Sequence, residues 1–210
     1  MLGVGDHEMN KMSNEEKFWN WFLQHETELI DFETAQETVF DKLATELGKI
    51  DPNLTFEFGP MDTRREFVIS AGGIMSAFPA VLSLAKAVPS LDRWKVIAFR
   101  PRRSPINTVE IRGKRIGPDD VQFTLVDNGK IAGIYLFIPG FRETDTDLKQ
   151  IGYLLLDESL GEFDVETRLG LIKMLSPSEH TDGKRYPLAE LAPLFDGLAA
   201  RLEGRSGEPS

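Results

Sequence analysis

Apolar residues recur at steps of three and four through the first quarter of the chain, which is the period of a helix with one buried face. The two series are Phe18, Trp21, Phe22, Leu29 and Phe32, followed by Val39, Phe40, Leu43, Leu47 and Ile50. Ser13–Glu16 and Thr34–Glu37 have the spacing of a capping box, in which a Ser or Thr side chain and a Glu side chain each accept a backbone N–H. We therefore expect two consecutive helices within residues 13–50, with a bend near Asp31–Glu33.

From residue 54 onward, apolar and polar residues alternate, which is typical of strands with one buried face. Leu54–Phe58 and Arg65–Ser70 predict an antiparallel hairpin. Val121–Leu125 and Ile131–Ile138 predict a second hairpin, because the Asn128-Gly129 pair between them favours a tight turn with positive φ.

An apolar helix is expected between the first hairpin and the next strand. Ser76 can cap this helix, Pro79 falls in its first turn, and Pro89 ends it. Its predicted apolar face consists of Ile74, Phe78, Val81, Leu82, Ala85 and Val88. The strand that follows, Trp94–Arg100, has apolar residues on both faces, so we expect it at the centre of its sheet.

The last third of the chain predicts a helix that starts at Thr144 or Thr146 and ends at Gly161, a strand over Val165–Leu175 and a helix over Pro187–Leu202. The resulting element order, ααββαβββαβα, predicts an α+β protein with a mostly antiparallel sheet and flanking helices. We expect a single α+β domain over residues 13–202, with the helical region 13–50 packed on it. Residues 1–12 are expected to form a flexible N-terminal tail and residues 203–210 a disordered C-terminal tail.

The composition indicates an acidic soluble protein, with a formal net charge of −10 over 210 residues. The absence of cysteine excludes disulfides, thiol catalysis and cysteine-ligated zinc, and it suits the cytoplasm. No apolar run approaches the roughly 20 residues of a membrane span. A strongly negative protein repels nucleic acid and anionic lipid. We therefore expect a cytoplasmic protein with no membrane or nucleic-acid partner.

The charge is unevenly distributed along the chain. Residues 1–59 contain 4 Lys and Arg against 13 Asp and Glu, residues 60–115 contain 11 against 4, and residues 116–210 contain 9 against 17. The basic segment contains two arginine groups, Arg64 with Arg65 and Arg100 with Arg102 and Arg103. If their strands are antiparallel neighbours, the two groups meet at one edge of the sheet, with Trp94 toward the opposite end. They would bind a carboxylate or phosphate there. The alternative is that they pair with acids of the flanking helices.

Two weaker patterns also carry candidate chemistry. Gly72-Gly73 lies between a strand and a helix, where free N–H groups favour an anion, although the spacing matches no phosphate-binding motif. The alternative is a tight turn that needs unusual backbone angles. An acidic run could hold a divalent cation but is expected to form a solvated face. Its members are Asp157, Glu158, Glu162, Asp164 and Glu166. We predict no catalytic residue, no metal site and no cofactor.

Several short motifs resemble those of a family of uncharacterised bacterial proteins of unknown function. They are Phe18–Phe22 (FWNWF), Ile69–Ala71, Phe78-Pro79 and the run from Trp94 through Ala98 to Arg100. The resemblance extends over most of residues 15–175 and implies a compact bacterial domain, without implying an activity or site residues.

Two functions remain open on these observations. The first is a cytoplasmic bacterial domain that binds a protein partner without catalysis, in an immunity-like, antitoxin-like or regulatory role, since segregated charge suits electrostatic steering. The second is a small enzyme or sensor that binds an anionic metabolite or nucleotide through the arginines. Either function is compatible with a homo-oligomer.

Overall fold

The computed structural model describes residues 12–206. It confirms the α+β fold, with helices beside sheets of mixed and antiparallel strands. The chain divides into two compact units, Met1–Ala98 and Phe99–Ser210, which we call the N-terminal unit and the C-terminal unit. The single domain over residues 13–202 stays a prediction. Among the described residues, no helix has both the length and the apolar composition that crossing a membrane requires.

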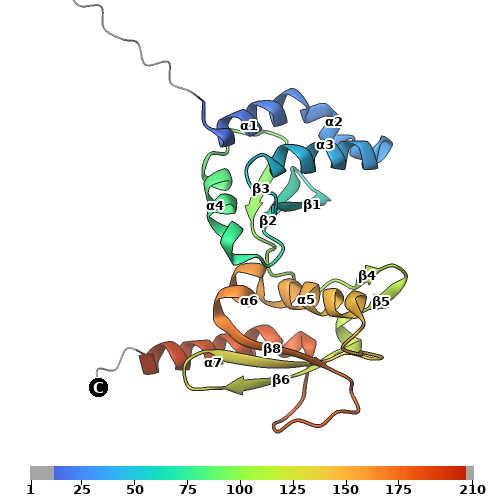
Figure 1. Cartoon of the computed structure of the whole chain (residues 1–210), viewed down its shortest axis with the longest axis vertical. Helices are drawn as coiled ribbons and strands as arrows, with labels where there is room; N and C mark the ends of the chain where they lie inside the picture. Colours follow the sequence, from blue (N-terminus) through green and yellow to red (C-terminus); the bar gives the residue numbers. More distant parts are fainter. Residues whose placement is uncertain (1–11, 207–210) are drawn as a thin grey trace, which may run out of the picture. The chain divides into compact units, whose positions relative to one another are not determined.

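The N-terminal unit combines a helical segment, a three-stranded sheet and one further helix (Figure 1). Its elements are α1 (Asn14–Gln24), α2 (Glu26–Ile30), the 3-10 turn η1 (Phe32–Thr34), α3 (Gln36–Gly48), β1 (Thr55–Met61), β2 (Arg65–Ser70), the 3-10 turn η2 (Met75–Ala77), α4 (Phe78–Lys86) and β3 (Trp94–Ala98). Residues 13–50 are helical as expected and the bend lies at η1, but the first of the two predicted helices is divided at His25 into α1 and α2.

Only one of the two predicted capping boxes forms. Ser13 Oγ accepts the N–H of Glu16 at 3.1 Å, and Glu16 Oε2 accepts the N–H of Ser13 at 2.8 Å. The second box is wrong, because α3 begins after Ala35 without a side-chain cap. Thr34 belongs to η1 instead, and its hydroxyl donates to the carbonyl of Asp31 at 3.0 Å.

The sheet of the N-terminal unit has the strand order β1-β2-β3. The predicted β1–β2 hairpin is confirmed as antiparallel, whereas β2 and β3 are parallel, with Arg65 opposite Trp94. The central position predicted for β3 is therefore wrong, since β2 occupies it. The helix between β2 and β3 explains their parallel direction, because parallel neighbours need such a crossover connection.

Aromatic side chains form the core of this unit. The Phe22 ring of α1 lies 5.1 Å from the rings of both Phe67 on β2 and Trp94 on β3. Trp19 of α1 donates its indole N–H to the carbonyl of Leu84 in α4 at 2.9 Å. Offset and edge-to-face aromatic pairs of this kind contribute about 0.5–1.5 kcal/mol each beyond burial. The motif Phe18–Phe22 is thus an anchor that attaches α1 to the sheet and to α4.

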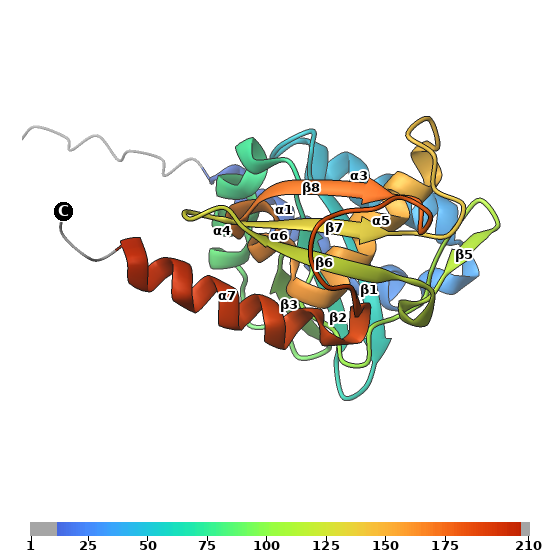
Figure 2. The same cartoon turned by 90° about the horizontal axis from the view of Figure 1, so that it is seen from below.

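The C-terminal unit contains a sheet of strand order β8-β7-β6-β9 and a separate β4-β5 hairpin. Figure 2 shows β8, β7 and β6 side by side. The elements are β4 (Val109–Ile111), β5 (Lys114–Ile116), the 3-10 turn η3 (Pro118–Asp120), β6 (Gln122–Asp127), β7 (Ala132–Phe137), α5 (Thr146–Leu160), α6 (Glu162–Arg168), β8 (Leu169–Leu175), β9 (Tyr186–Pro187), the 3-10 turn η4 (Leu188–Glu190) and α7 (Leu191–Ser206).

The β6–β7 hairpin confirms its prediction. Its pairing ends at Asp127 and Ala132, and Gly129 has a φ of 87°. The Asn128 side chain accepts the N–H groups of Lys130 and Ile131, which closes the turn. Residues from both sheet and helices then share one buried core. Its members include Phe123, Ile134, Leu136, Ile151, Leu155, Phe195 and Leu198.

Several boundaries in the C-terminal unit differ from their predictions. The cap of α5 is neither Thr144 nor Thr146, because Asp145 accepts the N–H of Leu148. The strand expected from Val165 starts only at Leu169, since the residues before it belong to α6.

The predicted disorder of residues 203–210 is wrong for residues 203–206, which continue α7. Leu202 is buried, and Glu203 pairs with Arg168, so both sides of the helix are held here. Residues 207–210 lie outside the described residues, as do residues 1–11 of the predicted N-terminal tail.

Candidate functional site

The two predicted arginine groups do not meet at one edge of a sheet. Arg65 lies opposite Trp94 at the start of β3, whereas Arg100 follows the other end of that strand. The expectation fails because β2 and β3 are parallel, so the start of β3, and not its end, lies beside Arg65. Each group therefore has its own neighbours.

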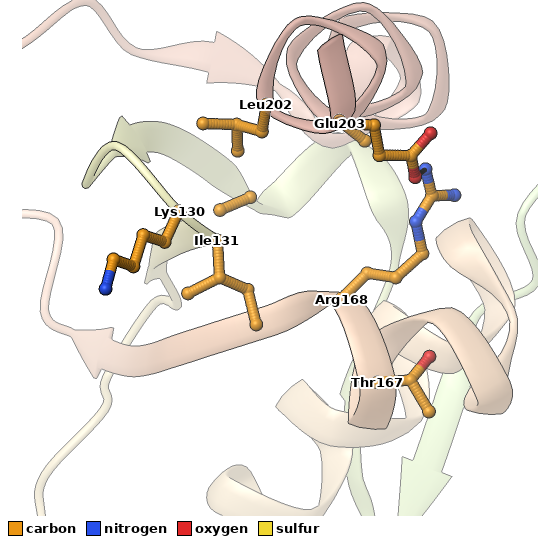
Figure 3. Close-up of a pocket in the computed structure, with 8 residues that line it drawn as sticks. Lys130, Ile131, Thr167, Arg168, Leu202 and Glu203 are labelled. Atoms are coloured by element: carbon orange, nitrogen blue, oxygen red, sulfur yellow. Dashed lines mark hydrogen bonds and ion pairs between the residues drawn. The ribbon is translucent and has the colours of Figure 1, made fainter. Parts of the chain in front are cut away.

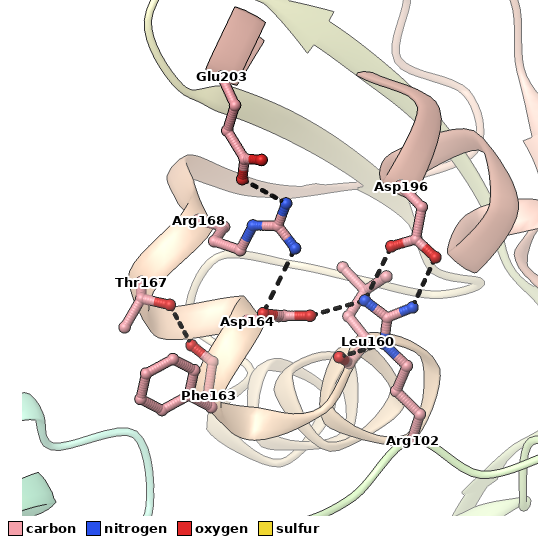
Figure 4. A network of polar contacts seen from close by, with 8 residues as sticks. All are labelled: Arg102, Leu160, Phe163, Asp164, Thr167, Arg168, Asp196 and Glu203. Carbon is pink, nitrogen blue, oxygen red and sulfur yellow. Dashed lines mark hydrogen bonds and ion pairs between the residues drawn. The ribbon is translucent and has the colours of Figure 1, made fainter. Parts of the chain in front are cut away.

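Arg102 connects three segments of the C-terminal unit (Figure 4). Its Nε donates to the Leu160 carbonyl at 2.7 Å, at the end of α5. Its terminal nitrogens donate to Asp164 of α6 at 2.6 Å and to both carboxylate oxygens of Asp196 of α7 at 2.9 Å. These partners, Asp196 first, raise the pKa of Arg102 above its usual value. The guanidinium is therefore bound to internal acceptors on several sides.

Arg168 extends the same network toward the end of α7. It lies 3.6 Å from Asp164 and donates to Glu203 at 2.7 Å. Figure 4 shows the chain of contacts from Glu203 through Arg168 and Asp164 to Arg102. Alternating charges of this kind neutralise one another and hold α6 and α7 in place.

Arg100 lies against the acidic run at the junction of α5 and α6. Its side chain contacts Asp157 at 3.3 Å, and its backbone N–H donates to Glu162 at 3.1 Å. The N–H of Glu162 in turn donates to the Arg100 carbonyl at 2.9 Å, and the N–H of Arg103 donates to the Glu158 carbonyl at 2.7 Å. Segment 100–103 is thus attached to this junction through backbone and side chains.

The solvated face predicted for the acidic run is wrong for two of its members. Asp157 is 6% exposed and Glu162 is 1% exposed. Burial raises the pKa of Asp157 to about 7, and this effect outweighs the opposing charge of Arg100 beside it. Among the described residues, no group of three or more His, Cys, Asp or Glu side chains has an arrangement that would hold a metal ion.

An open pocket of about 480 Å³ lies beside this network, between the β6–β7 turn, the α6–β8 junction and α7. Ile131 and Leu202 provide apolar walls. Figure 3 shows Arg168 and Glu203 paired at one side and Lys130 at the other. Because Glu203 neutralises Arg168, this pocket offers apolar surface more than it offers an anion site.

Arg65 of the N-terminal unit also has internal partners. It donates to Glu33 of η1 at 2.9 Å, and its guanidinium lies 4.9 Å from the centre of the Phe32 ring. Arg64, by contrast, lies at the surface and lines a separate pocket of this unit. The ligand role of the predicted site residues stays a prediction. The contacts of Arg65, Arg100 and Arg102 nevertheless support the alternative of pairing with acids.

Gly72 and Gly73 form a tight turn, with φ values of 58° and 79° that favour glycine. The N–H of Gly72 donates to Ser70 Oγ at 2.9 Å. The turn does not open α4, because η2 intervenes and the helix begins at Phe78 without a side-chain cap. The cap expected at Ser76 is therefore wrong.

The apolar face predicted for α4 is only partly buried. Phe78 and Val81 of this face are buried, together with Leu84, which the prediction did not include. Leu82 is instead 52% exposed, and Ile74 and Met75 just before the helix are 42% and 57% exposed. The sequence contained the signal for this surface, since the apolar residues around α4 cover more of its circumference than one buried face needs.

No protein-family model, curated protein or solved structure matches this chain. The resemblance to a family of uncharacterised bacterial proteins therefore stays a prediction.

Proposed function

We propose that this protein binds a protein partner, without catalysis, through exposed apolar residues on and before α4. We call Ile74, Met75, Pro79 and Leu82 the α4 stripe. Met75, Pro79 and Leu82 follow one another at steps of four and three, so they share one side of the η2–α4 segment. The exposure of the apolar members of this stripe is the observation that carries the proposal, because exposed contiguous apolar surface is typical of interaction sites.

The stripe is supported by a firmly attached helix. On its inner side, α4 buries Phe78, Val81 and Leu84, and the Leu84 carbonyl accepts the Trp19 indole N–H. A helix held in this way presents its outer residues without further ordering. Such pre-organisation lowers the entropic cost of binding a partner.

Charge complementarity indicates the chemistry of the partner. Helix α1 lies beside α4, where Glu15 accepts the Ser83 hydroxyl at 3.0 Å. The first turn of α1 also contains Glu16. A partner with an apolar centre and a basic group opposite this turn would therefore fit this surface, and opposite charge would accelerate its association. An immunity-like, antitoxin-like or regulatory role in the bacterial cytoplasm is the form of this function that we propose.

Affinity capture from native lysate tests the proposal when three proteins are compared. The wild type should recover a defined partner, and Leu82→Glu should lose it, because a carboxylate cannot be buried at an apolar contact without cost. Leu171→Glu is the matched control, since Leu171 is another exposed apolar residue, on β8 of the C-terminal unit. Recovery of the same proteins by all three, or of none at low and moderate salt, would contradict the proposal.

A further inference from the structure

A pocket of about 370 Å³ in the N-terminal unit has positively charged side chains and a hydroxyl in its lining, but no carboxylate. It lies beside the β1–β2 turn, the end of α4 and the start of β3. Arg64, Ser90 and Lys95 supply its polar lining, and none of its lining residues is Asp or Glu. In a protein with a formal net charge of −10, a lining with two cationic side chains and no carboxylate is a local reversal of charge.

Arg64 is the free cation of this pocket. Among the described residues it has no carboxylate within ion-pair distance, whereas Lys95 contacts Glu66 at 3.0 Å and the neighbouring Arg65 contacts Glu33. A guanidinium presents a planar fork of donors that matches a carboxylate. The carboxylate of a ligand is therefore a suitable partner for the exposed Arg64.

The remaining walls are apolar. Val88, Pro89 and Leu91 come from the segment between α4 and β3, and Trp94 begins β3. The Trp94 indole N–H is buried and has no acceptor among the described residues. Ligand sites usually combine such apolar walls with a few polar groups that fix orientation, in volumes of roughly 300–1,000 Å³.

We infer that this pocket binds a small organic carboxylate with an apolar body. The ligand carboxylate pairs with Arg64. Further donors come from Ser90 and Lys95, and the apolar body packs on Val88, Pro89 and Leu91. The site shares no residue with the α4 stripe, so it is a separate function from partner binding.

Isothermal titration with four probes tests this inference. The probes are acetate, 4-methylpentanoate, 4-methylpentanol and inorganic phosphate, each raised to about 10 mM, where weak ligands register. We expect 4-methylpentanoate to bind more tightly than any of the other three. Acetate lacks the apolar body, the alcohol lacks the charge, and phosphate has no group for the apolar walls.

Arg64→Ala should weaken 4-methylpentanoate binding about tenfold or more, the loss expected for one charged hydrogen bond. Arg112→Ala is the control, because Arg112 is an exposed arginine of the β4–β5 hairpin. It should bind as the wild type does. The inference is overturned if no carboxylate binds, if phosphate binds as tightly as 4-methylpentanoate, or if both arginine variants bind alike. Thermal melting of each variant confirms that it is folded.

Discussion

Arg102 has more structural consequences than its position in a loop suggests. Its contacts with Leu160, Asp164 and Asp196 connect α5, α6 and α7. Hydrogen bonds to charged groups contribute about 1.5–3 kcal/mol each when shielded, and less where solvent reaches them. Because this side chain is partly shielded, it stabilises the C-terminal unit more than an ordinary surface arginine does.

Replacing Arg102 tests that role. We expect Arg102→Ala to lower the free energy of unfolding by about 2 kcal/mol, because Asp164 and Asp196 lose their partner as well. Arg115→Ala, which removes a mostly exposed arginine 4.0 Å from Glu110, should cost below about 0.5 kcal/mol. Urea denaturation of both variants measures the difference, and equal stabilities would show that the Arg102 network is not structural.

Asp157 predicts an unusual dependence of stability on pH. Its pKa is about 7 in the folded protein, against about 3.9 in an unfolded chain. Between these values the folded state holds a proton that the unfolded state releases, so the contribution of Asp157 to stability falls as pH rises from about 4 to about 7. Above pH 7 the loss is complete and the contribution becomes constant.

Asp157→Asn removes this titration. Its stability relative to the wild type should rise between about pH 5.5 and about pH 7, by at most about 1.4 kcal/mol per pH unit, and then level off. Urea denaturation across this range gives the difference, in which the titrations of other carboxylates cancel. The exposed Asp119→Asn serves as control. A constant difference, or one that falls as pH rises, would refute the raised pKa.

Among the elements, local patterns predicted helices and hairpins well. The Ser13–Glu16 box and the Asn128-Gly129 turn depend on contacts within a few residues and form as predicted, whereas the equally spaced Thr34–Glu37 box does not form. The relative direction of β2 and β3 depends on the whole of α4 between them. The strand–helix–strand order was the available signal for a parallel pair. An antiparallel arrangement of β2 and β3, which ignores this order, places Arg65 and Arg100 at the same edge.

The candidate site was harder to predict for a related reason. Arg100 and Arg102 find acids that lie more than fifty residues away in the sequence, and burial of Asp157 depends on how α5 meets α6. Charge counts identify such residues as candidates without assigning partners. The exposure of Leu82 likewise depends on which side of α4 faces the core.

The two capping sites allow a direct comparison at helix starts. Ser13→Ala should lower the free energy of unfolding by about 1 kcal/mol, because an N–H of α1 loses its acceptor. Thr34→Ala should cost clearly less, since Thr34 only donates to a carbonyl of its own turn. Guanidinium denaturation of the two variants distinguishes them, and a larger loss for Thr34→Ala would contradict the assigned start of α3.

Charged side chains have different roles in the two units. In the C-terminal unit, Arg100 and Arg102 are occupied by internal carboxylates. In the N-terminal unit, Glu15 of α1 lies beside α4, which exposes Leu82, while Arg64 has no ion-pair partner among the described residues. We therefore expect intermolecular recognition to involve the N-terminal unit and to weaken as salt is added.

Hydrogen exchange of the captured complex, compared with the protein alone, tests partner binding at the α4 stripe most directly. Amides of residues 74–86 should exchange more slowly in the complex, and this protection should be absent when Leu82→Glu is mixed with the same partner. Unchanged exchange in residues 74–86, together with protection concentrated at residues 99–103 or elsewhere in the C-terminal unit, would contradict the proposed binding surface.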